Sequence, residues 1–308
     1  MPTRDGVGAS CVSLPDGPWR TIAEFLIQRF PAQPPEVWMQ RMHSAEVVDE
    51  HGVPVSPQRR YQRHLRVYYY RSLACEPRIP FDEVLLYRDA HLAVVDKPHF
   101  LPVLPSGRYL QETVLVRLKR RLGLDDIVPI HRIDRDTAGL VMFSLQAATR
   151  DAYHALFRQR AVRKTYQAIA PRRAELALPR LYESRLTHGT HFMQQQEVPG
   201  PVNARTHIRL LETAGALARY ELLPLTGRRH QLRAHMSALG IPIVGDGIYP
   251  RLVPEGPDFA RPLQLLAQSI AFTDPLTGQE RRFQSQRALV LGAVEPALNA
   301  CGRAGSPA

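Results

Sequence analysis

An acidic residue set among arginines is the feature of this sequence that points most directly to chemistry. Asp134 lies in the polar stretch 131–139, close to Arg132 and Arg135, and the apolar run 140–144 follows at once. An apolar run of this length predicts a buried strand, which would mount the acid on a rigid element. Because the guanidinium group suits phosphate, the pattern predicts a polyanionic substrate whose reactive part reaches one carboxylate.

The same stretch has two other interpretations. Asp134 and Asp136 are two residues apart, so in an extended segment both carboxylates could face a divalent metal ion. Arg132 and Arg135 argue against a metal site, since their charges lie where a cation would bind. The other interpretation is a surface loop of salt bridges, because such mixtures of charge are common on protein surfaces.

A second basic stretch covers residues 225–236. Thr226 could cap a helix that Gly240 and Pro242 would close. The apolar stripe of this helix would consist of Leu232, Met236 and Leu239. Arg229 and Arg233 are four residues apart and would share a face. A helix start with arginines and free backbone N–H groups predicts a receptor for phosphate or carboxylate.

The spacing of two histidines in this stretch argues against a metal site. His230 and His235 are five residues apart, which separates them by about 140° around a helix. They could not hold one ion as a pair four residues apart would. Tyr166 is a third candidate, on a probable strand, although a tyrosine on a strand is by default a core aromatic residue.

Taken in order, three stretches closely resemble the motifs of the Rlu-type pseudouridine synthases, which isomerise uridine in ribosomal or transfer RNA. The family's motifs read like His-Arg-Leu-Asp-Arg-Asp-Thr-Ser-Gly, Lys-x-Tyr and Gly-Arg-x-His-Gln-Leu-Arg-x-His, and their counterparts lie at 131–139, 164–166 and 227–235. The resemblance covers about residues 81–282. Mild departures are Ile133, Ala138 and Leu266, and the family's Lys-Pro-x-Gly motif is replaced by Lys97-Pro-His-Phe100.

The resemblance implies a role for each matched residue. Asp134 is expected to be the catalytic carboxylate, assisting cleavage of the glycosidic bond and holding the sugar while uracil turns to rejoin through its carbon five. Arg233 would pair with Asp134 and keep it ionised, and Tyr166 would stack on the base and help remove its proton. Arg132 would fill the position of the flipped base and Leu232 would pack on that base. The remaining candidates for binding the substrate RNA are Arg135, Lys164, Arg228, Arg229 and His131. No cofactor and no metal ion are expected, since an isomerisation needs neither a redox step nor a group donor.

Composition agrees with an RNA partner. The 308 residues carry 40 Lys and Arg against 29 Asp and Glu, a net charge of +11. Such an excess favours a nucleic acid over a solubility charge or an anionic membrane surface. We expect ribosomal or transfer RNA, not DNA or a membrane, to be the partner. Three distant cysteines, the lack of a signal peptide and the lack of an apolar run of about 18 residues predict a cytoplasmic protein, monomeric by default.

Local patterns predict four regions. Residues 1–17, rich in Gly, Ser and Pro, are expected to be a disordered leader, and 296–308 a frayed tail. Residues 18–73 predict two short helices, near 22–30 and 37–42, a hairpin at 47–53 with Gly52 in its turn, and a strand near 67–69. This arrangement resembles a small α+β S4-like RNA-binding domain. Its arginines and tyrosines could track a nucleic acid backbone and stack bases, or form a solvated basic linker.

Residues 78–295 are expected to form the catalytic domain, after a boundary at 77–80. Strands are predicted at 84–87, 92–95 and 165–170, and helices at 114–122 and 152–157, with a β-rich stretch to 225. No alternating strand–helix rhythm is seen, so the fold class is α+β with a mostly antiparallel mixed sheet.

Two other functions compete with RNA-uridine isomerisation. A non-catalytic RNA-binding or ribosome-assembly factor could keep the same fold, although such a protein should first lose its acid, and Asp134, Tyr166 and Arg233 are all present. A metal-dependent nuclease or phosphotransferase could use Asp134 and Asp136, and a strong chelator would abolish its activity.

Overall fold

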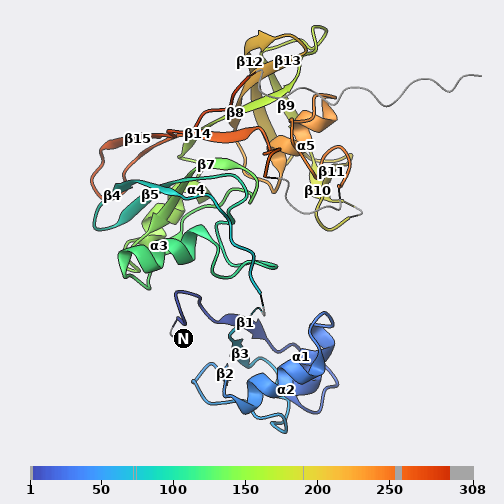
Figure 1. Ribbon diagram of the computed structural model, residues 1–308, viewed down its shortest axis with the longest axis vertical. Coiled ribbons are helices and arrows are strands. Elements are labelled where there is room, and N and C mark those ends of the chain that lie inside the picture. Colours follow the sequence, from blue (N-terminus) through green and yellow to red (C-terminus); the bar gives the residue numbers. More distant parts are fainter. Residues whose placement is uncertain (1–2, 72, 74, 190, 254–258, 292–308) are drawn as a thin grey trace, which may run out of the picture. The chain divides into compact units, whose positions relative to one another are not determined.

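The chain divides into two compact units in the computed structural model, which describes residues 3–71, 73, 75–189, 191–253 and 259–291. The first unit consists of Met1–Arg78 and Leu104–Asp125, and the second of Ile79–Val103 and Asp126–Ala308 (Figure 1). The segment Leu104–Asp125 therefore belongs to the first unit, whereas we had placed it in a catalytic domain of residues 78–295. The expected tail at 296–308 lies outside the described residues.

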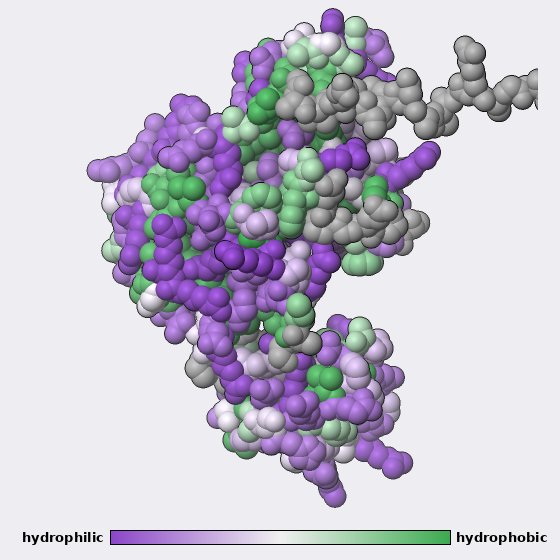
Figure 2. Space-filling view, viewed as in Figure 1, coloured by the Kyte–Doolittle hydropathy of each residue, from purple (hydrophilic) through white to green (hydrophobic). Residues whose placement is uncertain are grey.

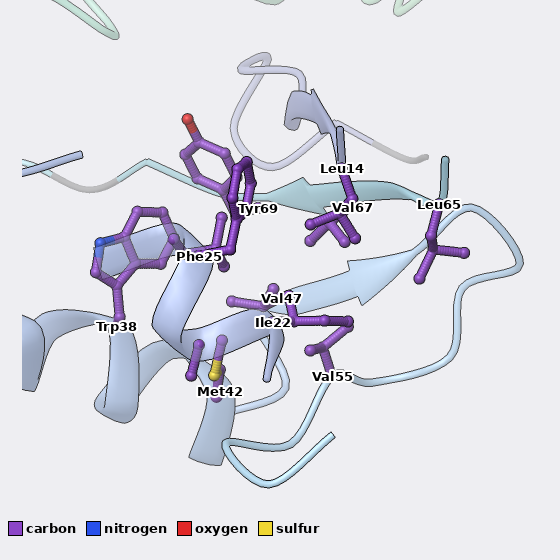
Figure 3. Close-up of a cluster of buried hydrophobic side chains, with 12 residues drawn as sticks. Leu14, Ile22, Phe25, Trp38, Met42, Val47, Val55, Leu65, Val67 and Tyr69 are labelled. Atoms are coloured by element: carbon purple, nitrogen blue, oxygen red, sulfur yellow. The ribbon is translucent and has the colours of Figure 1, made fainter. Parts of the chain in front are cut away.

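The first unit is a three-stranded antiparallel sheet packed on two helices. Strands β1 (Ser10–Ser13), β3 (Arg66–Tyr69) and β2 (Val47–Asp49) lie in the order β1-β3-β2, and the helices are α1 (Ile22–Arg29) and α2 (Pro35–His43). Side chains from all five elements enclose one core, in which Phe25, Trp38 and Tyr69 are the largest (Figure 3). The two helices and the strand near 67–69 were predicted from sequence and are confirmed.

Two expectations for this unit are wrong. Residues 1–17 are not a disordered leader over the part that the structure describes, because β1 pairs with β3 and Leu14 is fully buried. Around β1, the apolar side chains that join this core are Val12 and Leu14, too few to reveal a strand in the sequence. The hairpin at 47–53 is reduced to β2 and a single bridge between Val48 and Pro54, since the partner of β2 is β3.

Helix α3 (Val114–Leu122) completes the first unit. Its bounds confirm the helix predicted at 114–122; Thr113 caps its start, and Gly123 ends it in the left-handed conformation. Val116 and Leu110 share a small apolar cluster with Val7. The carboxylate of Glu76 accepts hydrogen bonds from the backbone N–H groups of residues 110–112. These contacts explain why Leu104–Asp125 groups with the N-terminal residues.

The second unit is built on a ten-stranded sheet. Its main path runs β4-β5-β7-β14-β8-β13-β12-β9, with β15 paired to β14 and β6 paired to β7 (Figure 1). The strands are β4 (Val84–Arg88), β5 (Leu92–Lys97), β6 (Val128–Pro129), β7 (Ala138–Ser144), β8 (Arg163–Pro171), β9 (Arg180–Ser184), β12 (Ala204–Ala214), β13 (Leu217–Pro224), β14 (Leu265–Thr273) and β15 (Glu280–Gln284). A separate hairpin consists of β10 (Leu186–His188) and β11 (Gln195–Glu197). Every pairing between the described strands is antiparallel except β7 with β14, which confirms the predicted α+β class and mostly antiparallel sheet.

Strand β14 joins the two halves of this sheet. It pairs with β7 through Ala138 and Gly139 on one side and with β8 on the other. Gly139 has a φ of 107°, and a Cβ there would lie 2.3 Å from the carbonyl oxygen of Ala267. Only glycine allows β7 and β14 to approach so closely.

Two helices complete the second unit. Helix α4 (Arg150–Arg158) places Tyr153 and Leu156 in a core beneath β5 and β7. Helix α5 (Gln231–Ala238) packs Leu232 and Met236 against residues of β8, β13 and β14. Hydrophilic residues cover most of the viewed face of both units, and the hydrophobic ones form small separate groups (Figure 2). Over the part of the chain that the structure describes, no helix is long and apolar enough to cross a membrane.

Candidate active site

Asp134 lies in the loop that leads into β7, at the centre of the site. The backbone N–H of Thr137 donates to the Asp134 carbonyl oxygen over 3.2 Å, which makes a tight turn before the strand. The neighbouring Ile133 is buried, while the Asp134 side chain keeps 27% of its surface exposed. The carboxylate is therefore fixed on a rigid element and still open to a substrate.

The closest cation to Asp134 is Arg233, on α5. Its Nη1 lies 3.4 Å from Oδ2 of Asp134, which brings together two residues that are 99 positions apart. The guanidinium group is almost fully buried, and it binds Asp246 in bidentate fashion at 2.8 and 2.6 Å. Burial alone would disfavour the charge of Arg233, but the hydrogen bonds and charge of Asp246, together with Asp134, outweigh it and raise the pKa of Arg233.

Tyr166 approaches the same carboxylate from β8. Its strand neighbours are Leu222 on β13 and Ala267 on β14, and its ring packs on the core that contains Leu232. Burial first, and then the charge of Asp134, raise the pKa of the Tyr166 hydroxyl. This residue is thus half-buried beside the acid and carries a phenol that resists ionisation.

Comparison with known proteins agrees with this geometry. A model of the RNA pseudouridylate synthase family matches residues 91–238. A dual-specificity RNA pseudouridine synthase, RluA of Haemophilus influenzae, is 31% identical over 66% of this chain and 92% of its own length. An uncharacterised RNA pseudouridine synthase of Synechocystis is 29% identical over 78% of this chain and 83% of its own. The chain belongs to the RluA-type RNA pseudouridine synthases. It is an isomerase that acts on RNA.

A solved structure shows the same fold. The human RNA pseudouridylate synthase domain containing 1 superposes with a TM-score of 0.57 at 22% identity, over 69% of this chain and 86% of that chain. At this identity the likeness concerns the fold alone.

Helix α5 of the synthase starts later than the sequence suggested. We expected Thr226 to cap the helix, but the first helical residue is Gln231 and the cap position is His230. The Thr226 hydroxyl donates instead to Oε1 of Gln231 and accepts from the backbone N–H of Arg205. Arg229 therefore lies before the helix and does not share a helical face with Arg233.

A buried polar network fixes this helix to the sheet of the synthase. The amide of Gln231 donates to the carbonyl oxygen of Arg205 and to the hydroxyl of Thr206, both at 2.9 Å. His235, fully buried, bridges the hydroxyls of Thr206 and Ser184 at 3.0 and 3.1 Å. Burial lowers the pKa of His235 to about 4, so its ring is neutral at physiological pH.

A buried lysine, Lys97, lies beneath the loop that carries Asp134. The Lys97 ammonium donates to the carbonyl oxygens of Pro98 and Arg135, at 2.9 and 2.8 Å. Burial lowers its pKa to about 7, although the charges of Asp136 and Asp134 oppose this. The Nδ1–H group of His99 donates to the carbonyl oxygen of Asp136 over 2.7 Å. In the synthase, the Lys97-Pro-His-Phe100 stretch thus supports the loop from below.

The other predicted substrate-binding residues fall into two groups. Arg132, Arg228 and Arg229 are exposed, with Arg228 donating to the carbonyl oxygen of Asn203 and Arg229 to that of Phe192. His131 and Leu232 point inward. The His131 ring stacks on Phe157 and accepts from the backbone N–H of Met142, and burial together with Lys164 lowers its pKa to about 3.

Lys164 and Arg135 are intermediate in exposure, since both side chains are partly buried. Burial lowers the pKa of Lys164. Arg135 forms an ion pair with Asp136 at 2.8 Å. With Asp134 facing Arg233 and Asp136 facing Arg135, the two carboxylates are each paired with an arginine. No group of three or more His, Cys, Asp or Glu residues suited to a metal ion is found among the described residues.

Two residues of the site were missed from sequence. Asp246 was not singled out, and His230 was considered only as a rejected metal ligand. Their signals were weak: one is a lone acid after an apolar stretch, and the other depends on a backbone conformation. His230 lies with Nε2 3.7 Å from Oδ1 of Asp134.

Proposed function

We propose that the synthase converts specific uridines of a structured RNA to pseudouridine by an Asp134-dependent mechanism without a cofactor. The observation that carries this proposal is the open Asp134 carboxylate, 3.4 Å from a buried arginine that Asp246 holds in place. A carboxylate that is held beside a cation, yet is accessible, suits a reaction that must stabilise or bind a sugar carbon during base transfer.

The bond changes define what the site must do. The bond between C1′ of the ribose and N1 of uracil breaks, and a bond between C1′ and C5 forms. The proton of C5 leaves and N1 gains one, so no redox partner is required. The uridine must first be flipped out of its stack, which costs a few kcal/mol. Arg132 would fill the vacated position, which its exposure two residues before Asp134 supports.

Tyr166 would contact the flipped base. Its raised pKa argues for a neutral phenol that stacks on uracil or donates a hydrogen bond, and against a phenolate that removes the C5 proton. Leu232 packs in the same core and would form the apolar floor beneath the base. Arg228, Arg229 and Arg135 would hold the RNA backbone, since each offers a charge at or near the surface.

Ribosomal RNA and transfer RNA are the two candidate substrates. The H. influenzae relative is named as dual-specificity, and for the present chain we favour ribosomal RNA, with the first unit acting as an S4-like RNA-binding domain. Its Arg and Tyr residues and the net charge of +11 support a structured RNA as the substrate. We place the activity in the cytoplasm, on a monomer.

Pseudouridine mapping tests the proposal. Total ribosomal and transfer RNA would be mapped in cells that lack the gene and carry either the wild-type protein or Asp134→Asn. One site should vanish in the deletion strain and return only with the wild-type protein. The control Asp151→Asn, which removes an exposed carboxylate of α4, should restore the site fully. A site restored by Asp134→Asn would refute the Asp134 mechanism.

A further inference from the structure

The two oxygens of the Asp134 carboxylate face different residues. Arg233 lies 3.4 Å from Oδ2, and Nε2 of His230 lies 3.7 Å from Oδ1. Both belong to α5 or its N-terminal cap, while 27% of the Asp134 side chain is exposed. A carboxylate held at one oxygen can rotate about its terminal bond, whereas contacts at both oxygens fix its plane.

The backbone conformation of His230 brings its ring to that position. The residue has a φ of 53° and a ψ of 17°, in the left-handed region, directly before α5. This conformation costs a residue with a Cβ about 1–2 kcal/mol. Gly or Asn would adopt it more easily, so the backbone alone does not favour histidine. Strain of this kind persists at functional sites when the surroundings hold the residue in place.

The ring is buried and partly unsatisfied. Only 8% of the His230 side chain is exposed, and its Nδ1 has no hydrogen-bond partner in the part of the chain that the structure describes. The groups around it are Asp134, Asp246, Arg229 and Arg233, with the Tyr249 ring edge-on at 5.9 Å.

This environment selects one form of the imidazole. A buried acceptor without a partner costs less than a buried N–H without one, which places the single proton of a neutral ring on Nε2, facing Asp134. Burial lowers the pKa of His230, with the charges of Arg233 and Arg229 acting in the same direction and that of Asp134 opposing. The ring therefore offers Asp134 one N–H group and no net charge.

We propose that His230 is a positioning residue that holds Oδ1 of Asp134 through its Nε2–H and thereby sets the plane of the catalytic carboxylate. The inference rests on the proposed role of Asp134. The separation of 3.7 Å exceeds a hydrogen bond, and contacts of catalytic groups commonly shorten once the substrate is bound. Arg233 and His230 then act together: one supplies the charge and the other the orientation.

A pair of substitutions separates this role from a backbone role. In His230→Gln the amide nitrogen occupies about the position of Nε2, while in His230→Asn it reaches only the position of Nδ1. Asn, however, adopts the left-handed conformation more readily than Gln. Positioning of Asp134 predicts that Gln retains most of the activity and Asn does not. A purely structural role predicts the opposite order.

The experiment measures single-turnover rates, RNA affinity and thermal stability of the full-length variants. His230→Asn should slow the bound reaction by about 10- to 100-fold, the effect of a catalytic group displaced by about 1 Å, with unchanged RNA affinity and melting temperature. His230→Gln should stay near the wild-type rate. An Asn variant as fast as the Gln variant would overturn the proposal. Asp134→Asn is assayed alongside: if it is active, the proposed function itself fails, whatever the His230 variants do.

Discussion

The buried guanidinium group of Arg233 contacts two carboxylates at different distances. Arg233 binds Asp246 twice, at 2.6 and 2.8 Å, and Asp134 once, at 3.4 Å. The short contacts hold the arginine, so the long one can change when substrate arrives. Asp134 thus keeps a cation beside it without being immobilised by it, a useful property in the proposed mechanism, where Asp134 contacts a moving sugar.

The substitution Asp246→Asn tests whether the contacts with Asp246 hold Arg233 in place. The amide keeps the shape of the side chain but leaves the buried charge of Arg233 without its main partner, and breaking a buried pair in this way costs about 3–5 kcal/mol. Arg233 should then turn to Asp134 and bind it more tightly, which lowers the rate of the bound reaction. Urea unfolding and single-turnover assays measure both effects. The control Asp151→Asn removes a solvent-exposed partner of Arg158 and should change neither. Unfolding of Asp246→Asn at the wild-type urea concentration would contradict the interpretation.

At the residue scale, the sequence motifs indicated which residues form the site but not which of them contact one another. The motifs pointed to Asp134, Tyr166 and Arg233, and these three residues do meet in the structure. Asp246 escaped notice because its partner is 13 residues away, across a turn that no local pattern encodes. His230 escaped because its position depends on a left-handed backbone, which residue type alone does not reveal.

At the scale of the elements, the pairing of β7 with β14 is tightly constrained by the close approach of their backbones. Gly139 is the second residue of β7, the strand that follows the Asp134 loop. Its Cα faces the backbone of Ala267, which pairs on the other side with Tyr166. The distance between Asp134 and Tyr166 therefore depends on how closely these strands pack.

Gly139→Ala should disrupt this crossing. The new Cβ would lie 2.3 Å from a carbonyl oxygen, so β7 must move away from β14 and the second unit should lose stability and activity. Gly278→Ala is the matched control: it also has a positive φ, but open space surrounds it. The control should lose only the conformational term of about 1–2 kcal/mol. Thermal unfolding of the two variants decides the matter, and equal losses would mean that steric overlap at Gly139 is unimportant.

Elements with a local signature were predicted well. Apolar residues at helical spacing indicated α1, α2 and α3. The start of α5 was wrong because Thr226 resembles a cap, and its hydroxyl is used by a side chain and a strand instead. Strand β1 was missed because two apolar side chains are too few to show alternation.

The molecule as a whole should be sensitive to acid below neutral pH. His99, His131 and His235 are buried in the second unit, and burial lowers their pKa values to about 4, 3 and 4. Unfolding returns each ring to its ordinary pKa of about 6.5, so the unfolded chain binds more protons below that pH. The contribution of these three rings to stability is therefore complete above about pH 6.5, falls as the pH drops towards 4, and levels off below their folded-state pKa values.

His235→Gln isolates one part of this effect. His235 alone accounts for about 3 kcal/mol of the loss between pH 6.5 and 4. The variant loses some stability at neutral pH, since its hydrogen bonds change, but its melting temperature should fall less steeply with acid. His207→Gln, an exposed position on the same strand as Thr206, should follow the wild-type curve. Parallel curves for all three proteins would disprove a role for His235 in acid sensitivity.

The organisation of the units was only partly accessible from sequence. The proline-rich segment at 77–80 marked the division at Arg78 and Ile79, but nothing local indicated that Leu104–Asp125 returns to the first unit. Its reasons are long-range: Glu76 binds three backbone N–H groups and Val7 packs on Leu110 and Val116. The order of strands in the large sheet is likewise a matter of tertiary contacts.

The late position of β14 in the chain has a consequence for synthesis. The strand that joins the two halves of the sheet begins at Leu265, so a ribosome has made every described strand of this sheet except β15 before the sheet can close. Until then β7 and β8 each present an unpaired edge, and open edges invite association with other chains. A transcript cut short before this strand would thus yield an aggregating fragment in place of a smaller enzyme, and the nascent protein should depend on chaperones until its last strands emerge.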